Sequence, residues 1–210
     1  MSQSQDQTAR RAAELLRDQL ARDIREAIHQ ACRESHAIQG PPPTVEQVRR
    51  HVDAMAMASQ GWASWQDDRR ARLQEVEQFL SSMEYFLDPL ELRVAGRAAQ
   101  GSLDAGDCVH IRAWTDCDLD DAAVVLENAG LGTPEIGSRS VQRSVANGLA
   151  RLGTMVFAGD SITFQVSLCP VRELVTLERN LVTGAPIDLA SLGRIRTIIE
   201  EMDSSSDHTG

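Results

Sequence analysis

The chain has 210 residues, of which 42% are hydrophobic and 25% charged, and its formal net charge is −10. These values are those of a soluble globular protein that is long enough to bury a substantial core without disulfides or metals. The acidic balance disfavours non-specific binding of nucleic acid, which requires clustered cations. All 21 basic residues are arginines, and no arginine-rich run contains interleaved aromatic residues. Nucleic acid is therefore not an expected partner.

The four cysteines, Cys32, Cys108, Cys117 and Cys169, are scattered and form no Cys-x-x-Cys pair. Such cysteines are typical of a reduced, cytosolic protein. The first residues are polar and do not resemble a secretory signal, and no apolar run approaches the roughly 18 residues of a membrane span. We therefore expect a cytoplasmic protein with no membrane partner.

The N-terminal part of the chain predicts helices. From Thr8 to Ser35, apolar residues recur at spacings of three and four, which indicates one amphipathic helix of about seven turns. Three consecutive prolines in residues 40–43 end it, because proline supplies no amide donor. Thr44 is the predicted N-cap of a second helix. The apolar stripe of this second helix comprises Val45, Val48, Val52 and Met55.

A third helix is predicted from about Trp62, directly after Gly61, to Phe86, before the helix-stopping pair Asp88 and Pro89. Amphipathic helices of soluble proteins normally bury their stripes within the same chain, so we expect intramolecular packing. A face that binds a partner is the alternative.

Residues 90–114 predict a strand, a glycine-rich turn and a second strand. In both strands apolar residues alternate with polar ones, which is typical of half-buried strands. The apolar positions are Leu90, Leu92 and Val94 in the first strand, and Val109, Ile111 and Ala113 in the second.

The acidic segment Asp116–Asp121 predicts the start of a short helix that ends before Gly130, because acids suit the positive end of a helix. A calcium loop is the alternative, but the glycine that it needs at position 6 is Asp121. Strands are expected over residues 138–145, 148–156 and 162–168, followed by a helix over 171–181. A last helix is expected to be capped by Asp188.

This order of elements predicts an α+β fold, with a small mixed sheet and helices packed on it. We expect three regions. They are an N-terminal helical region over residues 1–60, an α+β core over 61–202 and a disordered tail over 203–210.

The central turn resembles the signature of the nucleotidyltransferase superfamily, especially its minimal members. That signature runs Gly-Ser-x-Ala-x-Gly, six residues, then Asp-x-Asp and an apolar residue. Gly96 to Gly101, then residues 102–107, then Cys108 to Ile111 fit this spacing without a gap. The resemblance covers residues 70–202 and implies a nucleotidyltransferase-like sheet topology. The layout also resembles a group of functionally unassigned bacterial proteins of similar length.

The resemblance implies a chemistry that requires particular groups. Two carboxylates two residues apart on a strand, with a third on a neighbouring strand, hold magnesium ions at a triphosphate. Here Arg97 replaces the motif serine, while Cys108 and His110 replace the two carboxylates. The third strand offers only Thr163, Gln165 and Ser167. Thiol and imidazole are poor ligands for magnesium, so we expect a pseudo-enzyme without transferase activity, with no metal and no cofactor.

Cys108 and His110 share one face of their predicted strand, which leaves three interpretations. A zinc site would need two further ligands. A Cys–His nucleophile pair would need a third group to orient the imidazole, and none is identifiable. We expect the third interpretation, in which Cys108 is a small buried residue and His110 a hydrogen-bonded polar one.

Two functions follow from this sequence. The first is a protein-interaction module, or a homodimer, that works through the N-terminal helices, with Trp62 and Trp65 as candidate hot spots. The second is a pseudo-enzyme in which Arg97 and Arg112, with Arg93, bind a nucleotide or another phosphorylated ligand. An active magnesium-dependent nucleotidyltransferase is the least favoured.

Overall fold

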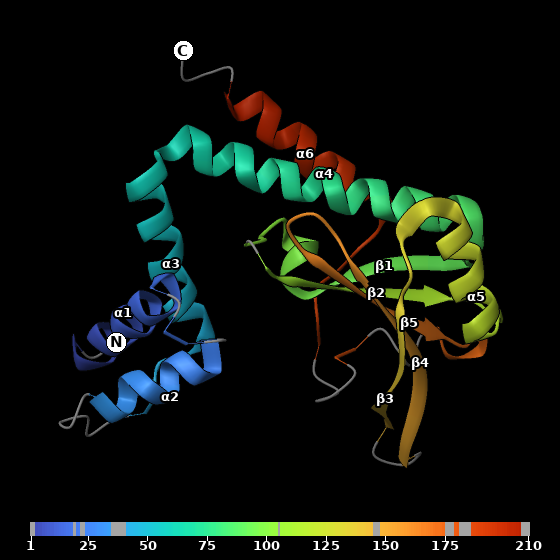
Figure 1. Cartoon of the computed structure of the whole chain (residues 1–210), viewed down its shortest axis with the longest axis horizontal. Helices are drawn as coiled ribbons and strands as arrows, with labels where there is room; N and C mark the ends of the chain where they lie inside the picture. The colour runs from blue at the N-terminus through green and yellow to red at the C-terminus, as the bar shows by residue number, and fades with distance from the viewer. Residues whose placement is uncertain are drawn as a thin grey trace. The chain divides into compact units, whose positions relative to one another are not determined.

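The computed structural model describes residues 3–18, 20–21, 24–34, 41–104, 106–144, 148–174, 179–180 and 186–206, and the side chains of 3, 141–144, 148–150, 205 and 206 are not described. The described residues form an α+β structure of six α-helices and one six-stranded mixed sheet (Figure 1). The chain divides into two compact units, residues 1–66 and residues 67–210. None of the helices in the described part of the chain is both long and apolar enough to cross a membrane.

The first unit contains α1 (Gln3–Arg17), α2 (Ile24–Glu34) and α3 (Val45–Gln60). Its core is rich in small residues, which let the helices approach closely. These buried residues are Ala9, Ala12, Ala13, Leu15, Ala21, Ala27, Ala31 and Val48. Arg11 of α1 forms an ion pair with Glu34 of α2 at 2.7 Å, and His51 of α3 lies 3.0 Å from the carboxylate of Asp6.

The prediction of one helix over residues 8–35 is wrong, because α1 ends at Arg17 and α2 begins at Ile24. A continuous helix would leave the apolar stripe without a partner, whereas two helices bury their alanines against each other. The interruption is hidden in the sequence because the apolar spacing continues through Leu20 and Ile24. Leu20 is in fact exposed.

The predicted signals at the ends of α3 are confirmed. The Thr44 side chain accepts a hydrogen bond from the Gln47 amide, and the Gln47 side chain accepts one from the Thr44 amide, which completes a capping box. Gly61 ends the helix with a φ of 85°. The long helix α4 (Trp62–Leu87) follows, and Asp88 ends it with a positive φ of 44°.

The second unit is built on the sheet, with strand order β3-β4-β5-β2-β1-β6. The strands are β1 (Glu91–Ala95), β2 (Cys108–Trp114), β3 (Glu135–Ser144), β4 (Gly148–Ala158), β5 (Thr163–Cys169) and β6 (Leu189–Ala190). β2 and β5 run parallel, and the other neighbouring pairs run antiparallel. Hence the strands predicted around the glycine turn and over residues 138–168 are confirmed, with shifts of a few residues at their ends.

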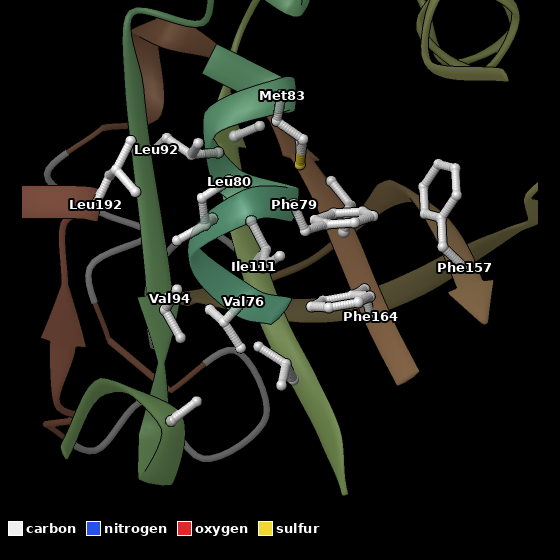
Figure 2. Packing of buried hydrophobic residues seen from close by; sticks show 14 of the residues in the cluster. Val76, Phe79, Leu80, Met83, Leu92, Val94, Ile111, Phe157, Phe164 and Leu192 are labelled. Atoms are coloured by element: carbon white, nitrogen blue, oxygen red, sulfur yellow. The ribbon is translucent and has the colours of Figure 1, made fainter. Parts of the chain in front are cut away.

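One face of the sheet packs against α4 (Figure 2). The ring of Phe79 stacks on Phe164 of β5, with centroids 4.0 Å apart and planes 4° apart, and its edge meets Phe157 of β4. Val76, Leu80 and Met83 extend this contact, at helical spacing, over β1 and β2. The apolar faces predicted for these strands therefore form the core of the unit.

α5 (Leu119–Leu126) begins where the acidic segment predicts it, with Asp120 and Asp121 in its first turn. Two expectations for the last helix need correction. The last helix, α6 (Leu192–Ser206), is capped by Ser191, whose hydroxyl accepts from the Arg194 amide. Asp188 is wrong as the cap because β6 intervenes. α6 also continues through Ser206, into the segment where a disordered tail was expected.

Of the helix expected over residues 171–181, the structure describes one 3₁₀ turn, Val171–Glu173. Residues 175–178 and 181–185 lie outside the described residues, so the rest of this expectation lies there as well.

Two glycines of the central turn give a matched test of the fold. Gly101 and Gly106 have φ values of 74° and 77°, but an added Cβ would lie 2.7 Å from Ile198 Cγ2 of α6 at Gly101 and would meet nothing at Gly106. We expect Gly106→Ala to lower the free energy of unfolding by about 1 kcal/mol through backbone strain alone. Gly101→Ala should lower it by roughly 1–3 kcal/mol more because of overpacking. Urea unfolding followed by circular dichroism checks this, and equal losses would contradict the packing of α6.

Candidate functional site: the polar face of the sheet

The face of the sheet opposite α4 carries the positions that the family signature uses. The register pairs Cys108 with Thr163, His110 with Gln165, and Arg112 with Ser167. Paired residues of neighbouring strands point to the same face, so these six side chains share one surface. β2 and β5 thus place Cys108 and His110 beside Thr163 and Gln165 on one face.

Among the described residues that β2 and β5 contribute to this face, the exposed ones lie at one end. Cys108 and His110, at the start of β2, are exposed. Arg112 is 3% exposed, and its neighbour Ser167 is also buried. Beyond them, Trp114, Leu152 and Cys169 form a small separate apolar cluster. The expectation that Cys108 is buried is therefore wrong.

The two residues at the open end are both held neutral. Partial burial raises the pKa of the Cys108 thiol, although the positive charge of Arg139 opposes this. Partial burial also lowers the pKa of His110, and the charges of Arg139 and Arg112 lower it further, against a hydrogen bond with Gln165. A Cys–His nucleophile needs a thiolate beside an imidazolium, so this pair has the wrong protonation for that chemistry.

Metal chemistry finds no support at this face. Among the described residues, no group of three or more His, Cys, Asp or Glu side chains is placed to hold a metal ion. This applies to the zinc interpretation of Cys108 and His110 and to the calcium interpretation of the Asp116–Asp121 segment. The positions that the resemblance assigns to magnesium carboxylates carry a thiol, an imidazole and the Gln165 amide instead.

Arg97 lies in the 3₁₀ turn Gly96–Gln100, and its guanidinium holds the following loop. Its Nη1 donates to Asp104 Oδ2 at 3.1 Å and to Asp107 Oδ2 at 3.0 Å, and its Nη2 donates to Ser102 Oγ at 2.9 Å. Asp107 Oδ2 also accepts from the Asp104 amide at 3.0 Å. We call this group, comprising Arg97, Ser102, Asp104 and Asp107, the Arg97 clamp. It contains one positive and two negative charges, which is unfavourable for binding a phosphate.

Backbone amides of the glycine turn are occupied as well. In the family chemistry that the resemblance implies, amides beside these glycines approach the phosphates. Here the Gly96 amide donates to the Asp188 carbonyl at 2.8 Å, and the Gly106 amide donates to the Ser161 carbonyl at 2.9 Å. The Gly101 and Ser102 amides donate within the turn, to the Ala98 and Arg97 carbonyls. A phosphate would have to displace these protein acceptors.

The other two arginines assigned to anion binding are also engaged. Arg93 of β1 forms an ion pair with Glu91 on the same strand at 2.7 Å. Arg112 lies beneath the surface in the middle of the polar face. The structure thus brings Arg93 and Arg112 to neighbouring register positions, but it places Arg97 in the clamp of the turn. Binding of an anion by these residues stays a prediction.

The residues that sequence reasoning missed are exposed aromatic side chains of α4. Tyr85 is 82% exposed and Phe86 46% exposed, and their rings meet edge to face with centroids 4.8 Å apart. Leu90, which was assigned to a buried strand face, precedes β1 and is exposed. The sequence does contain a signal for this exposure. The buried stripe of α4 runs through Val76, Leu80, Met83 and Leu87. Tyr85 and Phe86 fall outside that spacing.

Comparison of the chain with protein-family models, with curated proteins and with solved structures found no match.

The Arg97 clamp makes a prediction about stability. The side chains of Arg97, Asp104 and Asp107 are 20%, 26% and 22% exposed. We expect Arg97→Ser, which restores the serine of the family signature, to lower the free energy of unfolding by about 1–2 kcal/mol, because it leaves two carboxylates facing each other. Arg97→Lys should be intermediate because it keeps the charge without the planar fork.

The matched control is Arg194→Ser, which removes an exposed ion pair with Glu201. This variant should change the free energy of unfolding by no more than about 0.5 kcal/mol. Chemical unfolding of the three variants measures all these values. A loss at Arg97 as small as that at Arg194 would show that the clamp does not hold the turn.

Proposed function

We propose that this chain is a catalytically silent protein with a nucleotidyltransferase-like sheet, and that its function is to bind another protein. Two features of the topology support the likeness to that superfamily. The glycine turn joins antiparallel β1 and β2, and β5 lies directly beside β2. This places Gln165 next to His110, which is where the chemistry requires a third carboxylate next to the second.

The loss of catalysis follows from the groups at these positions. Without the three carboxylates, the described face lacks ligands for the metal ions that would neutralise the charge developing on a triphosphate, a contribution typically worth several kcal/mol of transition-state stabilisation. The Arg97 clamp and the occupied amides close the turn where phosphates would lie. These losses affect both the metal-binding and the phosphate-binding parts of the site, so no single substitution would restore it.

The helices α1, α2 and α3 bury their stripes against one another, and of the large apolar side chains in their described residues Val45 is exposed. Trp62, a predicted hot spot at the start of α4, is 56% exposed, and its ring centroid lies 5.2 Å from that of Trp65. The binding surface is therefore better assigned to α4. The single observation that carries this assignment is the exposure of Tyr85, 82%, beside exposed Phe86. Aromatic residues are enriched among interface hot spots, and a folded chain normally has no reason to keep two adjacent aromatic rings in water.

The test is the double variant Tyr85→Ala/Phe86→Ala. We expect its free energy of unfolding to stay within about 0.5 kcal/mol of the wild type, because both side chains are exposed. Its affinity for a partner should fall by about 2 kcal/mol, which is roughly 30-fold. Quantitative capture from lysate of the source cells compares wild type, the double variant and Leu20→Ala, a control for another exposed apolar residue.

A protein retained by wild type and by Leu20→Ala but lost by the double variant supports the proposal. Sedimentation of the purified chain shows whether that protein is a second copy. If wild type and double variant capture the same proteins in the same amounts, α4 is not the binding surface.

A second candidate, a pseudo-enzyme that binds a nucleotide, is favoured by one observation. Burial first, and then the positive charges of Arg139 and Arg112, lower the pKa of His110, so two arginine charges act at the open end of the polar face. For this candidate we expect binding heat with ATP, GTP or CTP in calorimetric titration without magnesium. Arg139→Gln should reduce that heat, because it removes one of the two charges. If none of the triphosphates gives heat at millimolar concentration, this candidate fails.

A further inference from the structure

β3 and β4 form a hairpin that extends beyond the rest of the sheet (Figure 1). β4 pairs with β5 only from Thr154 to Ala158, whereas its pairing with β3 continues back to Gly148. The distal part of the hairpin, residues 138–144 and 148–153, is therefore two-stranded. Two-stranded hairpins are marginally stable in water and gain stability from a third strand.

β3 is also the edge of the sheet. Its strand partner is β4, and on its other side no strand formed by the described residues lies beside it. Nor does any described residue outside the sheet form a backbone hydrogen bond with β3. A row of unpaired amides and carbonyls along ten residues is a template for a further strand.

The same hairpin is cationic in an acidic protein. β3 and β4 contain Arg139, Arg143 and Arg151 but only one acidic residue, Glu135 at the start of β3, whereas the whole chain has a net charge of −10. Arg139 pairs with Leu152, and Arg151 pairs with Ser140, so the two arginines point to opposite faces of the hairpin. Neither forms an ion pair with a described residue.

We propose that the outer edge of β3 binds an extended acidic segment of a partner protein as an additional strand. The inference rests on the proposed protein-binding function and adds a second surface and the chemistry of what it binds. The unpaired backbone groups select a peptide, which presents alternating donors and acceptors at the spacing of a strand. The arginines on both faces select acidic side chains, because alternate residues of an added strand point to both faces.

Two other occupants fit these observations less well. A second copy pairing through its own β3 would bring two arginine-rich edges together, and like charges opposite each other destabilise a strand pair. Nucleic acid matches the charge of the hairpin, but it offers no ladder of alternating donors and acceptors. It would also be repelled by the rest of the acidic chain.

The experiment uses the full chain and a fluorescein-labelled peptide of about ten residues with alternating Glu and Thr, a strand-forming and soluble sequence. Fluorescence anisotropy measures its affinity. We expect saturable binding below about 1 mM. The variant Arg139→Gln/Arg151→Gln should bind roughly fivefold more weakly, because the charge interactions of one half-buried and one exposed arginine are removed. The control Arg10→Gln/Arg50→Gln removes two exposed arginines from the first unit and should leave binding unchanged.

A second peptide separates strand addition from charge attraction. The same sequence N-methylated at alternate residues keeps every charge but cannot donate along one edge, and we expect its binding to fall at least about tenfold. If the methylated peptide or a single-stranded thymidine oligonucleotide of equal charge binds as well as the acidic peptide, charge alone is responsible and the inference is overturned. Equal binding by both arginine variants overturns it as well.

Failure of this inference is distinguishable from failure of the proposed function. If no acidic peptide binds but capture still depends on Tyr85 and Phe86, β3 is not a docking edge and the arginines serve to keep it from pairing with other chains. If acidic peptides bind but capture does not depend on these aromatic residues, the assignment of the binding surface to α4 fails and the β3 edge remains.

Discussion

The packing of α4 on the sheet is the contact on which the rest of the second unit depends. Phe79 stacks on Phe164, and Val76, Leu80 and Met83 continue the contact across β1 and β2. Because side chains alternate along a strand, fixing Val109, Ile111 and Phe164 beneath α4 fixes Cys108, His110 and Gln165 on the opposite face. Tyr85 and Phe86 of the same helix fall outside its buried stripe, which continues to Leu87, and stay in solvent. One packing contact therefore determines both the orientation of the polar face and the position of the exposed aromatic rings.

The side chains of the polar face are better suited to contacts within the protein than to catalysis. Its exposed end offers a neutral thiol, a neutral imidazole and an amide. Its middle is buried around Arg112, and the turn beside it is held by the ion pairs of Arg97 with Asp104 and Asp107. An enzyme of the nucleotidyltransferase type needs this turn open to phosphate and this face rich in carboxylates. Among the described residues, these positions of the face carry a thiol, an imidazole and an amide, and the ion pairs of Arg97 hold the turn.

Local patterns predicted most of this fold, and tertiary contacts account for most of what they missed. Alternation located β1, β2 and β5, and the capping residue Thr44 located α3. The break between α1 and α2 was missed because the apolar spacing continues across it, and only packing between the two helices selects a hairpin. The role of Arg97 was missed for a similar reason, since its partners Asp104 and Asp107 come together only when the turn folds. Whether Cys108 is exposed depends on which segments cover the face of the sheet opposite α4. The alternation of residues within one strand carries no information about those segments.

We propose that the polar face of the sheet does not bind a metal-bound nucleotide. Thermal melting of the full chain with ATP, GTP and CTP, each with and without magnesium, tests it most directly. A ligand at 100 times its dissociation constant would add about 2.7 kcal/mol to the free energy of unfolding, which is a shift of several degrees for a domain of this size. We predict no magnesium-dependent shift with any of the three. A magnesium-dependent rise in the melting temperature would contradict the account, because it would show that this chain still assembles a metal and nucleotide site.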